Sequence, residues 1–510
     1  MLRRVLPAAN AIFLGHMIAR LGSVILVPLF LRYWSATLYG EYLALFAAVS
    51  YLASLDVGMQ QASVNQLTKA YARGDLETYR TVQHTALAFY MVLAASATLL
   101  TGVLAWRLPV AHWIGLKLTS SFTAKAVIAL LALYLLWSMP VRLITATYQS
   151  IGNLSRTQWI ANLQQILVVI LSAIVLILGG GMLAIAFLQV ATVGFAALLV
   201  LLHLHRRLPM LFPGISGMRL SALKELAHPS LLFALLLVGN VVAFQGSTLI
   251  VSAVMGGLAV AVLSISKAVI DLIRQVLYSI TLALCPDFAR MEALGELEKL
   301  RKVHRLAVAA TAAITLALAA SVWYEGAQII IVWTRGRIEP DVVLLRLFLV
   351  LLAFQTPWAA SSTIATATNR HKVQAIGYFF SAGLGILLVL AFVHRLGTWA
   401  VPVGLALGEA VGCYHFVIQA TCRIIGESYA TFALRFWLGF AAVTTAVLAV
   451  GWIIHSLMPG PILVRWASMG LLTLFTAAVC GWMVWLTPED RATLLPKLRP
   501  VLAVSSIKTA

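Results

Sequence analysis

Polar and charged side chains recur at helical spacing inside segments that are otherwise apolar. Two sets share an i, i+4, i+7 pattern: His16, Arg20 and Ser23 near the N-terminus, then Asp56, Gln60 and Ser63 in the next apolar segment. This spacing predicts that each set lies on one face of a helix. A charge inside a membrane costs several kcal/mol unless it faces protein or water, so such residues are candidates for a binding site.

Two later segments carry similar stripes: Asn240, Phe244 and Ser247 in the first, and Ser264, Lys267, Asp271, Arg274 and Tyr278 in the second. Gln245 and Gln275 lie near these faces. The other apolar segments are expected to be mostly apolar on all faces, with Glu409 as the main exception. We therefore expect the four striped segments to face one another across a central hydrated cavity.

The stripes hold three cations against two anions, which leaves one positive charge in surplus. Arginine and lysine in a low-dielectric cleft suit an anion, and phosphate in particular. We predict that the following residues bind a substrate in the central cavity: Arg20, Lys267, Arg274, Asp56, Asp271, Gln60 and Asn240.

Four titratable residues are candidates for coupling to protons or cations: Asp56, Asp271, Glu409 and His16. A structural role stays open for the charged residues. Lys267 and Arg274 can each pair with Asp271 within one helix, and Arg20 can pair with Asp56 between helices. Because buried ion pairs rarely offset their desolvation, pairing alone is a weak reason for these charges.

The segments that carry these residues are membrane spans. The chain has 510 residues, of which 62% are hydrophobic and 10% charged, and its mean hydropathy is +0.96. These values exclude a soluble globular protein, a disordered protein and a secreted disulfide scaffold. The apolar runs are continuous over about twenty residues, which fits membrane helices and excludes the alternating strands of a barrel.

We predict an all-α polytopic membrane protein of about fourteen transmembrane helices. The expected spans are 8–31, 40–64, 84–105, 124–147, 159–179, 182–203, 230–254, 257–285, 305–324, 342–367, 372–393, 396–420, 433–456 and 463–486. The N-terminal apolar run has no convincing cleavage site, so we interpret it as an uncleaved first span.

Orientation follows from the 36 Lys and Arg residues. The N-terminus, the even-numbered connections and the C-terminus hold 24 of them, the odd-numbered connections hold nine, and Arg20, Lys267 and Arg274 lie inside spans. This split predicts that both termini are cytoplasmic. The net charge of +19 is therefore interpreted as a topology signal, and nucleic acid is not an expected partner.

The chain contains an internal repeat. Residues 74–82 (GDLETYRTV) match residues 295–303 (GELEKLRKV) at an offset of 221, Asn153-x-x-Arg156-x-Gln158 matches Asn369-x-x-Lys372-x-Gln374 at 216, and Gly40 matches Gly257 at 217. Convergence of short polar loops is the alternative. The repeat predicts two six-helix bundles with parallel orientation, a plan found in secondary transporters. The lobes are 1–203 and 230–421. A cytoplasmic linker, 204–229, joins them and includes a short amphipathic helix near 219–227, and 422–510 adds two helices and a cytoplasmic tail.

Motifs for covalent or nucleotide chemistry are missing from the sequence. There is no Walker A motif, no dinucleotide-binding loop and no His/Cys cluster for a metal. The four cysteines form no CxxC pair. We therefore expect neither an enzyme nor a cofactor.

Three short motifs resemble the first two spans of the polysaccharide transporter family, which belongs to the multidrug/oligosaccharidyl-lipid/polysaccharide exporter superfamily. They are residues 28–32 (PLFLR), 38–42 (LYGEY) and 55–58 (LDVG). The loop at residues 72–75 and the Asn153 and Asn369 loops are also similar, and Trp34-Ser35 departs from the family pattern. The resemblance covers the topology of nearly the whole chain.

This resemblance implies a Wzx-type flippase of the bacterial inner membrane. Such proteins move undecaprenyl-pyrophosphate-linked oligosaccharide to the periplasmic leaflet for O-antigen, capsule or exopolysaccharide assembly. The implied fold is a V of two bundles that opens alternately to each side, and the implied partners are the lipid-linked glycan, membrane lipids, and a glycan polymerase with its export machinery. Two alternatives stay open: a cation-coupled exporter of small drugs with the same fold, and a membrane glycan polymerase, ligase or glycosyltransferase.

Overall fold

A computed structural model describes residues 2–56, 58–227, 231–368, 370–458, 461–486 and 491. Every regular element among these residues is a helix, which confirms the predicted all-α class. The chain divides into two compact units. Unit 1 comprises 1–264, 331–339 and 389–400, and unit 2 comprises 265–330, 340–388 and 401–510. These units are defined by packing and the predicted lobes by sequence, so the lobe boundaries stay a prediction.

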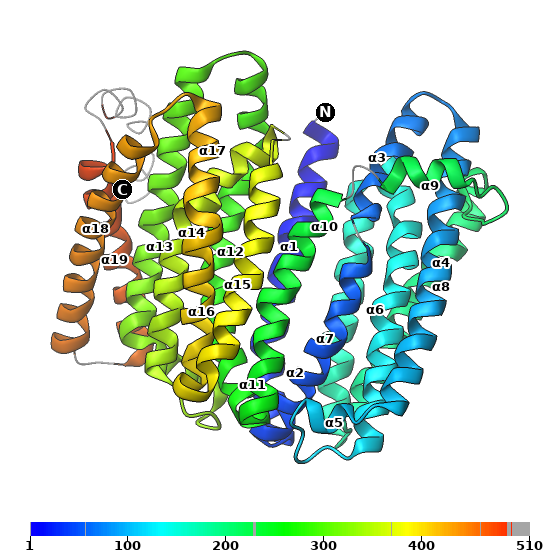
Figure 1. Ribbon diagram of the computed structural model, residues 1–510, viewed down its shortest axis with the longest axis horizontal. Coiled ribbons are helices and arrows are strands. Elements are labelled where there is room, and N and C mark those ends of the chain that lie inside the picture. Colours follow the sequence, from blue (N-terminus) through cyan, green and yellow to red (C-terminus); the bar gives the residue numbers. More distant parts are fainter. Residues whose placement is uncertain are drawn as a thin grey trace, which may run out of the picture. The chain divides into compact units, whose positions relative to one another are not determined.

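Unit 1 contains the helices that surround the first site described below (Figure 1). They are α1 (Leu2–Tyr33), α2 (Ala36–Ser50), α3 (Met59–Ala72), α4 (Leu76–Arg107), α5 (Val110–Trp113), α6 (Ser121–Ser150), α7 (Leu154–Ile177), α8 (Met182–Arg207), α9 (Leu220–Ala227), α10 (Leu231–Val241), α11 (Ser247–Met255) and the start of α12 (Gly257–Ala293). Helix α6 packs against α4 and α8 and lies at the centre of this group.

Unit 2 contains the rest of α12 and the C-terminal helices. They are α13 (Leu297–Thr334), α14 (Val342–Ala367), most of α15 (Lys372–Leu396), α16 (Ala400–Glu409), α17 (His415–Ile425), α18 (Tyr429–Leu457) and α19 (Ile462–Val484). The final pair, α18 and α19, is tied to α13 through Glu325, which is buried and accepts hydrogen bonds from His455 and Arg465, both at 2.8 Å.

The span count agrees with the prediction. Eleven segments are long and apolar enough to cross a membrane. One of them, Lys372–Ile425, is 54 residues long and contains two helices separated by a 3₁₀ turn, Gly397–Trp399. Helices α1 and α12 are also long enough at 32 and 37 residues. The division between α11 and α12 falls at Gly256, whose φ of 84° suits a residue without a Cβ.

The repeated loop motif adopts the same conformation twice. Gly74 and Gly295 both have positive φ, at 73° and 70°. In each case the next residue donates its backbone N–H five residues back, from Asp75 to Ala70 and from Glu296 to Met291. Asp75 also caps α4 by accepting from the Thr78 N–H, and hydrogen bonds from Thr78 lower the pKa of its carboxyl. The second loop match cannot be compared, because Asn369 lies outside the described residues.

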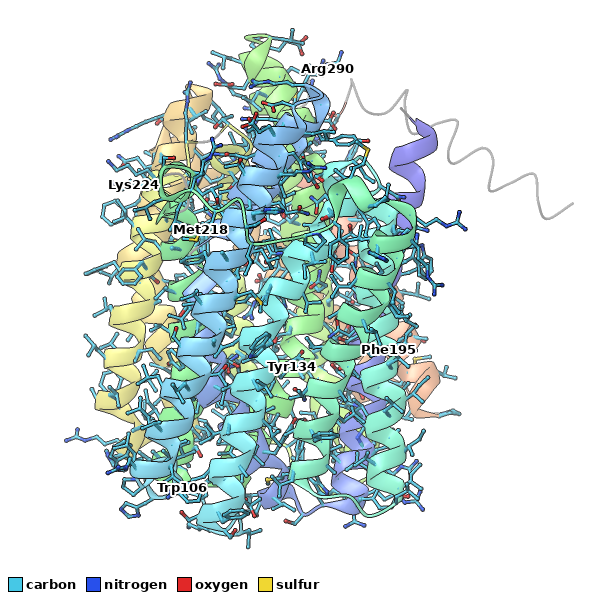
Figure 2. The ribbon with its side chains drawn as sticks, turned by 90° about the vertical axis from the view of Figure 1, so that its right-hand side faces the viewer. Trp106, Tyr134, Phe195, Met218, Lys224 and Arg290 are labelled. Carbon is cyan, nitrogen blue, oxygen red and sulfur yellow. The ribbon has the colours of Figure 1, made fainter. Side chains whose placement is uncertain are left out.

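The connection after α8, residues 208–219, is hydrogen-bonded to α4. The predicted short helix is present as α9, and the preceding loop bonds to polar groups on less than two turns of α4. Arg80 and Gln83 donate to the carbonyls of Met210 and Leu211, both at 3.3 Å, while His84 accepts the Gly217 N–H at 3.1 Å. Figure 2 places Met218 and Lys224 of this connection at one end of unit 1 and Trp106 at the other.

Helix α2 and the start of α12 approach each other closely at two glycines. A Cβ added at Gly40 would lie 1.7 Å from the Gly257 carbonyl oxygen. The next residue, Glu41, is fully buried and accepts the backbone N–H groups of Lys117, Leu118 and Thr119 at 2.6–2.8 Å. The Thr119 hydroxyl adds a fourth bond at 2.6 Å. These contacts hold α2, α12 and the 114–120 loop together.

Candidate functional site

A cavity of about 640 Å³ lies inside unit 1. Its wall is formed by residues of α2, α3, α6, α7 and α8, and α6 contributes the longest stretch, from Tyr134 to Gln149. Since α6 rises about 1.5 Å per residue, this stretch is roughly 22 Å long. The C-terminal end of α6 bonds to α4 beside the 208–219 connection, through Tyr79 and Ser150 at 2.9 Å. The cavity therefore runs from the middle of α6 towards the linker end of unit 1.

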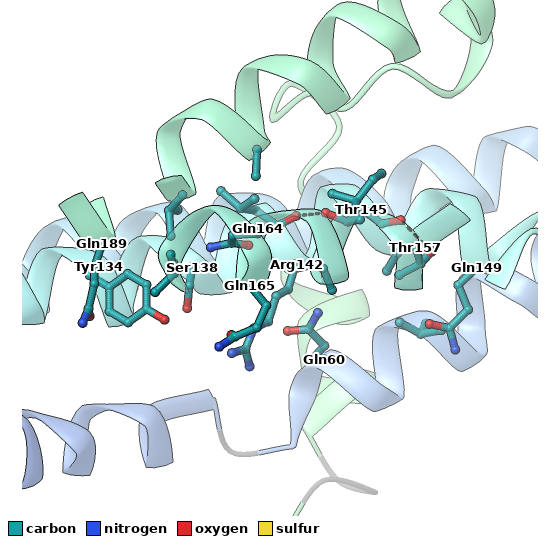
Figure 3. Close-up of a pocket in the computed structure, with 18 of the residues that line it drawn as sticks. Gln60, Tyr134, Ser138, Arg142, Thr145, Gln149, Thr157, Gln164, Gln165 and Gln189 are labelled. Atoms are coloured by element: carbon teal, nitrogen blue, oxygen red, sulfur yellow. Dashed lines mark hydrogen bonds between the residues drawn. The ribbon is translucent and has the colours of Figure 1, made fainter. Parts of the chain in front are cut away.

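The lining mixes apolar side chains with ten polar ones and carries one charged residue among those described. Five amides share it with one guanidinium and several hydroxyls: Gln60, Gln149, Gln164, Gln165, Gln189, Arg142, Tyr134, Ser138, Thr145 and Thr157. Figure 3 shows Gln60, Arg142 and Gln165 projecting into the cavity from α3, α6 and α7. No carboxylate lines the cavity among the described residues, so its charge is positive.

Helix α6 stays continuous past an interior proline. Pro140 cannot donate a backbone hydrogen bond, which frees a carbonyl one turn earlier. Two hydroxyls next to this position bond within the helix, from Ser138 to Leu135 O and from Thr145 to Val141 O, both at 2.6 Å. Side-chain hydroxyls of this kind satisfy backbone groups inside a membrane. Pro140 itself is buried and does not line the cavity, and the two hydroxyls bond to carbonyls other than that of Leu136, which the proline leaves without its usual donor.

Arg142 was missed by the sequence analysis, which counted it with the charges of the fourth connection. The structure places it inside α6, where its side chain is exposed to the cavity. A signal was available: Tyr134, Ser138, Arg142, Thr145 and Gln149 follow one another at intervals of four, four, three and four residues. That spacing is a single helix face. Helices α6, α7 and α8 are thus further exceptions to the expectation that most of the other spans are apolar on all faces.

The predicted stripe on the second span is also wrong. A 3₁₀ segment, Tyr51–Asp56, ends the first part of this span, and α3 begins at Met59 after Gly58, whose φ is 72°. This break separates Asp56 from Gln60 and Ser63. Gln60 lines the cavity, Asp56 accepts a hydrogen bond from the Tyr90 hydroxyl, and Ser63 is fully buried and bonds to the Met59 carbonyl.

Three other predicted residues belong to unit 1. The backbone of α1 carries His16 and Arg20, but their side chains lie outside the described part of the structure. Asn240 is on α10 and is exposed, two residues before a π-helical segment, Val242–Gly246. Asn240 is not among the residues that line the cavity.

Unit 2 brings three predicted charges into one hydrogen-bonded network. Arg274 on α12 donates to Asp271 at 2.5 Å and to the Gln355 side-chain oxygen at 3.1 Å. Gln355 then donates to Glu409 on α16 at 2.6 Å, and the Trp358 ring N–H donates to the same carboxylate at 3.1 Å. The Asp271–Arg274 pair left open as a structural alternative is therefore formed. Lys267 lies one turn before Asp271 on α12 and is half-buried.

Glu409 and Arg274 are the two most buried charged residues of this network. Glu409 is 7% exposed, and the Arg274 side chain is 11% exposed. Two neutral donors, Gln355 and Trp358, bond the Glu409 carboxylate among the described residues, and Gln355 links it to Arg274.

Comparison with protein-family models and with curated protein sequences finds no match. Solved structures do match. An inward-facing multidrug resistance MATE family transporter of the MOP superfamily has a TM-score of 0.66 at 17% identity, covering 80% of this chain and 98% of that one. Lipid II flippase MurJ, in an inward closed conformation, has a TM-score of 0.67 at 12% identity, covering 93% and 98%.

The chain has the fold of the MOP-superfamily transporters. A further MOP-superfamily transporter, from Pyrococcus furiosus, matches with a TM-score of 0.60 at 16% identity, covering 83% of this chain and 96% of that one. At these identities the similarity establishes the fold alone.

Proposed function

We propose that this chain is a flippase for undecaprenyl-pyrophosphate-linked oligosaccharide, the repeat unit of an O-antigen, capsule or exopolysaccharide. It would carry this cargo from the cytoplasmic to the periplasmic leaflet of a bacterial inner membrane, with both termini in the cytoplasm. No covalent step is required. The partners would be the lipid-linked glycan, membrane lipids, and a polymerase with its export machinery.

The cavity of unit 1 carries this proposal. Amide and hydroxyl groups pair with sugar hydroxyls, and Arg142 attracts an anion. A cationic drug would meet one guanidinium and no lining carboxylate among the described residues, so the cavity's charge opposes it. The MurJ neighbour supports the same reading, because a protein with this fold flips a lipid-linked precursor.

Deleting the protein tests the function directly. We expect a complete, unpolymerised repeat unit to accumulate on its lipid in the inner leaflet, measured by extraction and mass spectrometry with leaflet-specific labelling. Normal lipid-linked pools would contradict the flippase and favour the drug exporter, which a resistance phenotype that follows expression would then support. Repeat units that reach the outer leaflet without polymerising would instead identify a polymerase.

Arg274 provides a second test, because it is the predicted substrate-binding cation that joins Asp271 to Glu409 through Gln355. Replacing Arg274 with alanine is expected to abolish surface glycan while membrane abundance stays normal. Asp271, Glu409, Asp56 and His16 remain the candidates for ion coupling. Surface glycan at the wild-type level in Arg274→Ala would show that the Asp271–Arg274 pair is structural.

A further inference from the structure

The unit 1 cavity is lined by amides and hydroxyls that suit a sugar and, among the described residues, by one arginine that is able to pair with one negative charge. We propose that it is a saccharide-binding subsite in which Arg142 selects a sugar that carries a single carboxylate, such as a uronic acid. This inference depends on the proposed function and narrows its cargo from lipid-linked glycans in general to those with an acidic sugar. The inference is supported by three properties of the cavity: its shape, its amide groups and its charge.

The shape suits a chain of sugar rings. The lining on α6 extends over roughly 22 Å, from Tyr134 to Gln149, inside a volume of about 640 Å³. Helix α7 faces the cavity with residues at helical intervals from Thr157 to Val168. A compact ligand would leave much of this polar wall without partners, and unpaired polar groups inside a membrane are costly.

The amides are available for binding. Four of them, Gln60, Gln149, Gln164 and Gln165, make no side-chain hydrogen bond to another described residue. Each offers both a donor and an acceptor, which matches the hydroxyls of a sugar ring. Gln189 is held in place, because its amide nitrogen donates to the Tyr42 hydroxyl at 2.8 Å. Tyr134 adds a ring face and a hydroxyl at the inner end of the cavity.

The charge selects the kind of anion. Arg142 is exposed to the cavity and forms no hydrogen bond or ion pair with another described residue. Asp56 in the same unit accepts a hydrogen bond from the Tyr90 hydroxyl, on which Arg142 also acts electrostatically. Asp56 is not a cavity-lining residue, and no ion pair joins it to Arg142 among the described residues. One guanidinium pairs bidentately with one carboxylate. The pyrophosphate diester of the carrier has two negative charges, and the described part of the lining offers one guanidinium to them.

The test uses purified full-length protein in nanodiscs and two soluble probes. One probe is a trisaccharide with a single glucuronic acid, and the other is the same trisaccharide with its carboxylate reduced to an alcohol. Calorimetry should show the wild type binding the acidic form about tenfold to a hundredfold more tightly. Arg142→Gln should remove this preference, while Arg142→Lys should keep part of it.

A matched control separates this effect from loss of charge alone. Arg156 begins the next helix, lies over the Tyr148 ring at 5.4 Å and does not line the cavity. Arg156→Gln should therefore preserve the preference. Gln165→Leu should weaken both probes equally, because it removes hydrogen bonds to sugar hydroxyls and leaves the charge.

Three results would overturn the inference. They are equal affinity of the wild type for both probes, a preference that survives Arg142→Gln, and displacement of the acidic probe by inorganic pyrophosphate in the wild type but not in Arg142→Gln, which would assign Arg142 to the carrier. All three leave the flippase proposal intact if the deletion strain accumulates lipid-linked repeat units. Normal lipid-linked pools in that strain would instead refute the proposed function itself.

Discussion

Replacing Gly40 with alanine is expected to prevent stable folding. The added Cβ would lie 1.7 Å from the Gly257 carbonyl oxygen and 3.0 Å from the Ala261 nitrogen, both of which are backbone atoms that cannot rotate away. Helices α2 and α12 would have to separate, and overpacking against backbone costs about 3 kcal/mol or more. We expect little or no folded protein by size-exclusion chromatography of a fluorescent fusion.

Gly102 provides a matched control for this prediction. It lies inside α4 in the same unit, and a Cβ there would meet nothing within 4 Å. Because alanine is the better helix former, Gly102→Ala should leave the thermal unfolding temperature unchanged or raise it slightly. If Gly40→Ala behaved like Gly102→Ala, the close approach of α2 and α12 would be absent from the folded protein.

Replacing Glu41 with alanine is expected to produce the second-largest loss. The buried carboxylate accepts three backbone N–H groups and one hydroxyl, and the substitution removes all four acceptor contacts. An unsatisfied buried donor costs about 1–3 kcal/mol, so a total loss of about 3–5 kcal/mol is reasonable. Thermal unfolding in detergent should show a large decrease in the midpoint temperature.

Two further substitutions check the cause of this loss. Glu41→Gln keeps one acceptor oxygen but turns an NH₂ group towards backbone donors, so its stability should fall between those of Glu41→Ala and the wild type. Glu77 is an exposed carboxylate that pairs with Arg219 at 3.4 Å, and Glu77→Ala should cost less than about 1 kcal/mol. Equal midpoints for Glu41→Ala and Glu77→Ala would contradict the proposed role of the buried bonds.

The sequence was sufficient to predict the spans, because a membrane helix requires about twenty apolar residues and nothing else in the chain resembles one. The loop motif at Gly74 was equally informative, since its glycine, its capping carboxylate and the following helix are set by neighbouring residues. The position of a span is a local property, and local patterns therefore predicted it, whereas the cytoplasmic location of the termini stays a prediction.

The site was harder to predict because it depends on where helices end and which faces meet. Asp56 and Gln60 share a helical spacing, yet a 3₁₀ segment and Gly58 separate them. Arg142 looked like a loop cation, because charge near the end of a span usually marks orientation. Its place in the cavity depends on the packing of α3 and α7, which bring Gln60 and Gln165 to the same space.

Gly40 and Gly257, which the predicted internal repeat pairs with each other, lie in contact. A residue that meets its own counterpart is the mark of an isologous interface, in which one patch is complementary to itself. Between identical chains, one substitution in such a patch changes both sides at once. Here the two sides belong to one chain and mutate separately, so the close approach of α2 and α12 requires a small residue at both positions.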